Sequence, residues 1–317
     1  MENTDIIDYG SEISRMKKEK NAVILAHYYQ TGDIQDIADF VGDSLALSQK
    51  AASNNADIIL FAGVKFMAET AKILAPEKKV LLPDINAGCS LADSCKADDF
   101  RKFIKENPGR TVITYVNTTA EIKALSDISC TSSNAVQIVN SLPPDEKIIF
   151  APDRNLGNHV KSITGRDIIV WNGTCHVHEE YSLEAIIKLK DEYPEAKVIV
   201  HPECELPVRM VADFIGSTAA LLNYTKKDES EYFIVATEPG ILHQMKKANP
   251  GKCYIPVPPK DSTCGCSECN FMKLITMKKI YECLKKEKPE IRVNKKIIAK
   301  ARKPIRRMIE ISEKLGL

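Results

Sequence analysis

Residues 22–48, AVILAHYYQTGDIQDIADFVGDSLALS, contain a pattern that occurs three times in the chain. An apolar segment ends in a polar or aromatic residue, and a hydroxyl-bearing residue follows at the start of a helical pattern. The spacing between the two is 17 residues in each copy: His27 to Ser44, Tyr115 to Ser132, and His201 to Thr218. The residues just before the hydroxyl also agree, as IADFVGDS, LSDISCTS and VADFIGST. Spacing and local chemistry together indicate an internal triplication with a period near 87 residues.

The order of apolar segments around this pattern predicts the fold class. In the first copy NAVILAHYYQ, ADIILFAGV and KKVLLPD are typical of buried strands, and KFMAETAKIL is typical of a helix. Alternating strands and helices favour parallel sheets with right-handed crossovers. We therefore expect an α/β protein of three similar three-layer α/β/α units, each with about three short parallel strands. Such sheets bind ligands beyond the C-terminal ends of their strands, so we expect a pseudo-threefold arrangement around a central active site.

The repeat also predicts the boundaries of the units. We expect the first unit at residues 1–90, the second at 91–176 and the third at 177–269. Residues 270–317 read as helical and basic, with an apolar stripe, and we expect them to complete the first unit.

Composition narrows the class of protein. The 317 residues include 44 Lys and Arg against 43 Asp and Glu, so net charge gives no reason to expect a nucleic-acid or membrane partner. No apolar run approaches the 18 or so residues that a membrane span needs. The N-terminal stretch has no apolar core typical of a signal peptide. We expect a cytoplasmic protein.

Ten cysteines in a reducing compartment suggest metal or redox chemistry rather than disulfides. One cysteine ends each copy of the repeat: Cys89, Cys175, and one of Cys264, Cys266 and Cys269. Repeat spacing favours Cys264, which lies 89 residues after Cys175, whereas Cys269 lies 94 after it. For the other five cysteines, the simpler interpretation is that they are small buried or incidental residues. They are Cys95, Cys130, Cys204, Cys253 and Cys283.

Three thiolates are one too few to close a [4Fe–4S] cluster, which normally takes four. One iron would then be open to water or substrate and could act as a Lewis acid, as in a hydro-lyase. Scattered structural cysteines remain an equal alternative at this point. A structural zinc site would need four ligands, and CGCSEC alone is a weak signal for one.

The repeated polar positions are the candidate substrate-binding and catalytic residues. Ser44, Ser132 and Thr218 are expected at helix N-termini, where free N–H groups and the helix dipole favour anions, although plain capping is the alternative for each. The strand ends carry three pairs: His27 and Tyr29, Tyr115 and Asn117, His201 and Glu203. Glu203 is our candidate general base, since it is the only carboxylate of that set. His178 could equally support the site or lie on the surface.

Several long motifs resemble those of the quinolinate synthase family over nearly the whole chain. They are ILAHYYQ, IADFVGDSLALS, YVNTTAEIKALSDISCTSSNAV, FAPDRNLG, NGTC, VIVHPEC, DFIGST and ARKPIRRM. The resemblance implies an enzyme of NAD biosynthesis that condenses iminoaspartate with dihydroxyacetone phosphate to quinolinate, releasing phosphate and water. It also implies one [4Fe–4S] cluster per chain, held by three cysteines with one open iron, and an aspartate-oxidising enzyme as a possible supplier of iminoaspartate.

The resemblance also assigns residues. The CNFMK context points to Cys269 as the third cluster ligand beside Cys89 and Cys175, against the preference from spacing. Catalytic roles are implied for Glu203, His201 and Tyr29. Substrate binding is implied for His27, Ser44, Tyr115, Asn117, Ser132, His201, Glu203 and Thr218. Some relatives carry CxxCxxC where this chain has CGCSEC, which leaves open whether Cys264 and Cys266 form a redox pair. A different iron–sulfur hydro-lyase, a non-catalytic redox sensor and a zinc-stabilised interaction protein are the competing hypotheses.

Overall fold

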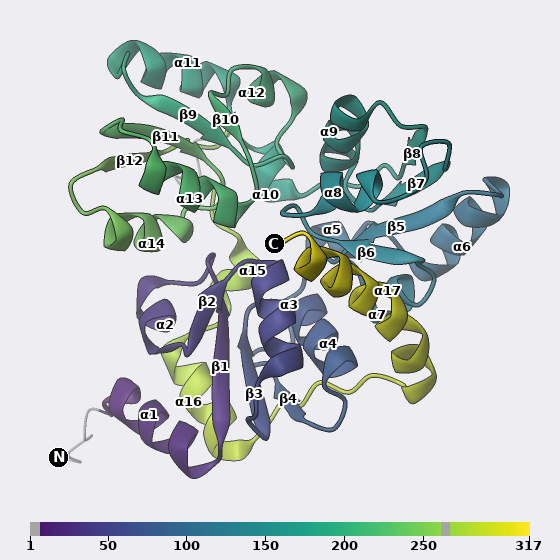
Figure 1. Cartoon of the computed structure of the whole chain (residues 1–317). Helices are drawn as coiled ribbons and strands as arrows, with labels where there is room; N and C mark the ends of the chain where they lie inside the picture. The colour runs from purple at the N-terminus through teal and green to yellow at the C-terminus, as the bar shows by residue number, and fades with distance from the viewer. Residues whose placement is uncertain (1–6, 261–266) are drawn as a thin grey trace.

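Three four-stranded sheets surround a common centre in the computed structural model, which describes residues 7–260 and 267–317 (Figure 1). Every strand pair is parallel. The strand orders are β2-β1-β3-β4, β6-β5-β7-β8 and β10-β9-β11-β12, so the three sheets share one topology. The fold class expected from the repeat, three similar α/β units with short parallel sheets around a centre, is confirmed.

The first sheet contains β1 (Ala22–His27), β2 (Phe40–Gly42), β3 (Ile58–Ala62) and β4 (Lys79–Leu81). The helices of this part are α1 (Tyr9–Glu19), α2 (Gly32–Ile37), α3 (Ser44–Ser53) and α4 (Lys65–Leu74). We call these elements the first unit.

The second unit has β5 (Thr111–Tyr115), β6 (Ile128–Cys130), β7 (Ile148–Ala151) and β8 (Ile168–Val170). Its helices are α6 (Ala97–Glu106), α7 (Ala120–Lys123), α8 (Ala135–Asn140) and α9 (Arg154–Thr164). The short helix α5 (Ser90–Asp93) precedes it.

The third unit has β9 (Lys197–Val200), β10 (Phe214–Ile215), β11 (Tyr232–Ala236) and β12 (Cys253–Pro256). Its helices are α11 (Leu183–Glu192), α12 (Leu206–Met210), α13 (Thr218–Lys227) and α14 (Ile241–Ala248). The short helix α10 (His176–Glu179) precedes it, and α15 (Asn270–Lys273), α16 (Met277–Lys286) and α17 (Lys295–Lys314) follow it.

Each sheet has four strands, so the expectation of about three was wrong. The additional strands are β2, β6 and β10, which are only two or three residues long, too short for an alternating pattern to be recognised. An aspartate of the repeated string holds each one at the sheet edge. The carboxylates of Asp39, Asp127 and Asp213 accept the N–H groups of Ile24, Val112 and Val198 at 2.8 Å, and the aspartate N–H groups donate back to the same residues.

The largest hydrophobic cluster spans two of the units, and separate clusters lie in the second and the third unit. One cluster joins the first and second units and includes Ile280 of α16 and Ile305 and Met308 of α17. Two other clusters lie in the third unit, built around Val198 and Phe233. Helix α16 packs on α1, whereas α17 contacts α4 of the first unit and α7 and β6 of the second. The unit boundaries given above therefore stay a prediction.

The described ranges, 7–260 and 267–317, contain no helix with both the length and the apolar character needed to cross a membrane.

Candidate active site

A cavity of about 60 Å³ lies at the centre, where the C-terminal edges of the three sheets meet. All twelve residues predicted as site residues line it: His27, Tyr29, Ser44, Cys89, Tyr115, Asn117, Ser132, Cys175, His201, Glu203, Thr218 and Cys269. His178 also lines the cavity and is buried, so it is not a surface residue. The sequence reading missed Asp43 and Glu238, which are charged residues of the same wall.

Two histidines at equivalent strand ends face the cavity as neutral rings. The N–H of Tyr29 donates to Nδ1 of His27 at 3.2 Å, and the N–H of Glu203 donates to Nδ1 of His201 at 3.3 Å. Burial lowers the pKa of each ring to about 3. Because Nδ1 accepts and the ring is neutral, Nε2 carries the hydrogen in both. His201 donates it to Ser132 Oγ at 3.2 Å.

Glu203 lies at the junction of the second and third units. Its Oε1 accepts the hydroxyl of Tyr115 at 2.5 Å, and its Oε2 lies 3.3 Å from Nδ1 of His178. Burial raises the pKa of Glu203, but the contacts with His178 and the Tyr115 hydroxyl outweigh it and leave the pKa below its usual range. The amide of Asn155 holds the main chain by donating to the Glu203 carbonyl at 3.0 Å. Glu203 is therefore an oriented, ionised carboxylate in a closed site.

The repeated hydroxyls do not cap the helices, so plain capping, the alternative for each, is wrong, although Ser44 and Thr218 do lie at helix N-termini as expected. Asp43 caps α3 and accepts from the N–H of Ala46, and Ser217 caps α13. Ser44 and Thr218 are the first helical residues instead, and Ser132 precedes α8, whose N-cap residue is Asn134. In the first and third units, the residue just before the hydroxyl, Asp43 or Ser217, accepts the free N–H of the helix with its side chain. The hydroxyls remain free for the cavity, where Thr218 Oγ1 lies 2.9 Å from the Tyr29 hydroxyl.

Three cysteines occupy equivalent positions before short helices. Cys89, Cys175 and Cys269 are the N-cap residues of α5, α10 and α15, each four residues long. In each case the carbonyl of the cysteine accepts the N–H four residues on, and a longer helix, α6, α11 or α16, begins eight residues after the cysteine. Cys264 and Cys266 lie outside the described residues.

The chemistry of this donor set fits an iron–sulfur cluster. Burial raises the pKa of Cys89 to about 12 and raises the pKa of Cys175 and Cys269 above the usual value. Cys269 also raises the pKa of Cys89, and both of these thiols raise the pKa of Cys175, which indicates that the three lie close together. Thiolates that burial disfavours are stabilised by bound metal, since the metal replaces the lost hydration.

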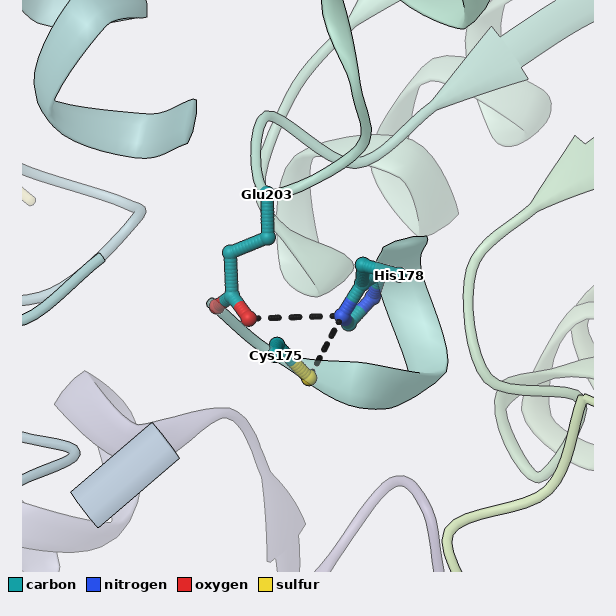
Figure 2. Close-up of side chains that lie close together, drawn as sticks. All are labelled: Cys175, His178 and Glu203. Carbon is teal, nitrogen blue, oxygen red and sulfur yellow. Dashed lines mark hydrogen bonds and ion pairs between the residues drawn. The ribbon is translucent and has the colours of Figure 1, made fainter. Parts of the chain in front are cut away.

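A second donor group lies beside Cys175. The sulfur of Cys175, a ring nitrogen of His178 and a carboxylate oxygen of Glu203 all lie within 4.8 Å of one another, and Figure 2 shows them converging. His178 Nδ1 is 3.2 Å from the Cys175 sulfur. Sulfur, imidazole and carboxylate are ligand types that also suit zinc.

Two buried carboxylates, Glu238 and Asp153, lie near the cysteines Cys269 and Cys175. Glu238 accepts the N–H of Cys269 at 3.2 Å and pairs with Lys273 at 2.8 Å. Asp153 caps α9 by accepting the N–H of Leu156 at 2.6 Å, and burial raises its pKa well above the usual value. Asp153 follows β7 and Glu238 follows β11, the third strand of each unit, by two residues, in APD (151–153) and ATE (236–238), and this repeated signal could have identified them. The first unit has Val64 at that place.

Comparison with known proteins gives consistent matches. The family model described as "Quinolinate synthetase A protein" matches residues 11–310. The quinolinate synthase of Thermosynechococcus vestitus is 59% identical over 306 residues, covering 96% of both chains. Those of Rippkaea orientalis and Synechocystis sp. are 59% and 58% identical over 305 residues; each match covers 96% of this chain, and 94% and 96% of the relative. Since the family model and these relatives all match nearly the full length of this chain, the chain belongs to the quinolinate synthetase A family.

Proposed function

We propose that this enzyme condenses iminoaspartate with dihydroxyacetone phosphate, forming quinolinate, phosphate and two waters for NAD biosynthesis. Family membership supports a quinolinate synthase. The observation that carries the chemistry is a single cavity that combines three cysteines, the Glu203 carboxylate and several neutral hydrogen-bond donors. Condensation followed by dehydration needs groups that move protons and groups that bind several anionic substituents, and this cavity offers both.

The proposed cofactor is one [4Fe–4S] cluster on Cys89, Cys175 and Cys269. When bound with three ligands, such a cluster supplies an open iron that polarises a substrate oxygen or nitrogen as a Lewis acid. The equivalent N-cap positions of the three cysteines support this set. The carboxylate of Glu238 would orient Cys269 through its main-chain N–H group.

Residues of the chain have the following proposed roles. Glu203 takes and returns protons, because it is ionised and lies beside Tyr115 and His178. Tyr29 and His201 assist, since both can donate to a departing oxygen. Carboxylate and phosphate groups of the substrates would bind the remaining polar residues of the wall: His27, Ser44, Tyr115, Asn117, Ser132 and Thr218.

Iron, sulfide and quinolinate analysis of anaerobically purified protein tests the assignment. Cys89→Ser, Cys175→Ser and Cys269→Ser should each lose the cluster absorbance and quinolinate formation. Cys253→Ser is the matched control, because Cys253 is exposed at the start of β12 and should leave both unchanged. A cluster that survives in Cys89→Ser and Cys175→Ser would favour an electron carrier or redox sensor.

Two further outcomes separate the remaining alternatives. Zinc with little iron would favour a zinc site at Cys175, His178 and Glu203. An intact cluster with no quinolinate from the two substrates would favour another hydro-lyase. An aspartate-oxidising enzyme as the source of iminoaspartate, and a cytoplasmic location, belong to the same proposal.

A further inference from the structure

One buried polar side chain holds the strand-end loop in each of the three units. It lies eight residues after the strand-end residue and belongs to the short helix that follows, α2, α7 or α12. The three side chains are Gln35, Lys123 and Arg209, counted from His27, Tyr115 and His201. Each of the three is at most 7% exposed, and none is among the described residues that line the cavity. A buried donor at the same repeat position in every unit indicates a shared task behind the cavity wall.

In the second unit, Lys123 bonds to main-chain carbonyl oxygens on both sides of Asn117. Its Nζ donates to the carbonyl of Val116 at 2.7 Å and also to the carbonyl of Thr118. Burial lowers the pKa of Lys123 to about 8, and the nearby carboxylate of Glu69 opposes that shift. The Lys123 side chain therefore holds, from inside the protein, the loop that carries a cavity residue.

Gln35 makes the same two bonds in the first unit. Its Nε2 donates to the carbonyl oxygens of Tyr28 at 2.9 Å and Gln30 at 2.8 Å, which lie on both sides of Tyr29. The same nitrogen also lies 2.9 Å from the Gly240 carbonyl of the third unit. An amide nitrogen here makes the contacts that an ammonium nitrogen makes in the second unit.

Arg209 makes one of these bonds in the third unit. Its Nε donates at 2.9 Å to the carbonyl of Cys204, the residue directly after Glu203. Asn155 holds the carbonyl of Glu203 itself at 3.0 Å. Two side chains therefore fix the Glu203 loop, and Arg209 supplies the contact from the repeated position.

Peptide geometry explains why bonds to these carbonyls orient the side chain between them. A peptide bond is planar, so a bond to the Val116 carbonyl fixes the plane that joins Val116 to Asn117. The bond to Thr118 fixes the chain on the other side, and little freedom remains at the Cα of Asn117. Oδ1 of Asn117 is buried and has no hydrogen-bond partner within the described ranges, so a substrate donor can bind it directly. A loop displaced by about 1 Å would move this amide away from the substrate.

We propose that these three side chains are positioning residues, each of which aims the cavity residue of its own loop at the substrate. The pairs are Gln35 with Tyr29, Lys123 with Asn117, and Arg209 with Glu203. The inference rests on the proposed function, which assigns substrate binding to Asn117 and proton transfer to Glu203. Loss of a donor should therefore impair the step that its own cavity residue serves, which is binding for Lys123 and turnover for Arg209.

A pair of substitutions at Lys123 separates the donor from the side-chain volume. Lys123→Met removes the donor and keeps the length. Lys123→Gln keeps a donor, and Gln35 shows that a glutamine at this repeat position reaches both carbonyls. Both variants remove the positive charge, so any effect of leaving Glu69 without its cation is the same in each.

Lys190→Met is the matched control. Lys190 of α11 also donates to two main-chain carbonyls, those of Pro194 and Ala196, but these precede β9 and lie at the sheet edge away from the cavity. Kinetics are measured with each iron-loaded protein, with iminoaspartate generated in the assay, and rates are expressed per cluster. The two binding constants are KM for dihydroxyacetone phosphate and the dissociation constant of quinolinate. Asn117→Ala shows which of them depends on Asn117.

Lys123→Met should raise the constant that Asn117→Ala raises. The expected increase is about tenfold, as for one lost hydrogen bond to a charged group, while kcat stays within about threefold. Lys123→Gln should recover most of this loss, and Lys190→Met should leave both constants unchanged. The double variant of Lys123→Met with Asn117→Ala should bind no more weakly than Asn117→Ala alone, because Lys123 acts through Asn117.

The matching pair in the third unit should affect turnover instead. Arg209→Met should lower kcat by about 10- to 100-fold with little change in either binding constant, because Glu203 loses its orientation. Arg209→Lys should recover most of this loss, since Lys123 shows that a lysine at this repeat position reaches the equivalent carbonyl. This pair also decides the question if Lys123→Met does not fold.

Three results at Lys123 would overturn the positioning role. They are a change of less than about twofold in both binding constants of Lys123→Met, an equal loss in Lys123→Gln, and additive losses in the double variant with Asn117→Ala. Equal losses of kcat in Arg209→Met and Arg209→Lys would overturn it for the third unit. Absence of quinolinate from the unchanged iron-loaded enzyme would instead overturn the proposed function.

Discussion

The joint between the first and second units is apolar, whereas the joint that the third unit makes with both is polar. Helix α17 lies across the first joint, and its Ala301, Ile305 and Met308 are fully buried in the shared core. Burial of the Ile305 and Met308 side chains contributes about 1.5–3 kcal/mol each relative to exposure. This joint therefore holds the two units together by the hydrophobic effect.

The third unit meets the others largely through hydrogen bonds. Its Glu203 accepts from Tyr115 of the second unit, and its Thr218 and Thr237 bond to Tyr29 of the first. Ser133 Oγ also donates to Ser217 Oγ at 2.7 Å. Net hydrogen bonds contribute only about 0.5–1.5 kcal/mol each, but a buried polar group left unpaired is costly. The comparison teaches that this repeat protein separates the two tasks. The apolar contact between the first and second units provides stability, and the polar contact with the third unit carries the residues of the active site.

Glu203→Gln should give the largest effect and tests the polar joint. We expect kcat for quinolinate to fall about 10²–10⁴-fold, because the amide cannot take a proton, while the cluster content stays normal. Glu205→Gln is the matched control, since Glu205 is two residues away and pairs with Lys260 at the surface. Near-normal turnover of Glu203→Gln with an intact cluster would show that the base is elsewhere.

Ile305→Ala tests the apolar joint. The side chain is fully buried in α17, so we expect the free energy of unfolding to fall by about 2–5 kcal/mol, while kcat of the folded enzyme stays within a few-fold. Urea denaturation measures the first and the quinolinate assay the second. Arg306→Ala, on the exposed face of the same helix, should change stability by no more than about 0.5 kcal/mol. Equal losses in the two variants would contradict the assignment of this joint as the apolar one.

Acidification should weaken the polar joint through His27 and His201. Their pKa falls from the usual 6.5 to about 3 on folding, because burial disfavours the charged ring. The unfolded chain then binds more protons than the folded one between these values, so stability is full above about pH 6.5 and declines as the pH falls toward 3. Thermal unfolding at pH 7.5, 6 and 5 should show this decline. A dependence just as steep in His27→Gln and His201→Gln would assign it to other groups.

The smallest effect is expected at the rim of the same joint. Asp36 of the first unit pairs with His243 and Lys247 of α14 at 2.9 and 2.8 Å, but its side chain is 48% exposed. Asp36→Asn should therefore cost less than about 1 kcal/mol of unfolding free energy and should not change kcat. A larger loss, measured by urea denaturation, would show that the rim and not the buried contacts holds the third unit.

The sequence predicted much of the fold because its signals are local. The strand and helix periodicities can be recognised along the chain without knowing which residues are neighbours in space. The same is true of the aspartate in IADF, LSDI and VADF. The short edge strands were missed because two or three residues carry no period. The caps were misassigned by one residue or more, because only the structure shows which side chain, such as Asp43, accepts the free N–H.

The third cysteine shows the limit of counting along the chain. Spacing from the previous repeat favoured Cys264, because more residues separate β12 from Cys269 than separate β4 from Cys89 or β8 from Cys175. Counting forward to the next long helix gives eight residues for all three cysteines, and that count identifies Cys269 as the equivalent residue.

The sequence by itself determined the triplicated α/β fold, the family and twelve of the residues that line the cavity, since a repeat places the same chemistry at the same strand end each time. Only the tertiary structure decided which residues act together. His178 and Thr237 have no counterpart of the same residue type in the other units, and they lie between Glu203 and Tyr29 because three sheet edges converge and bury them side by side. Hydrogen bonds between distant segments depend on distance in space, and the sequence alone does not contain that distance.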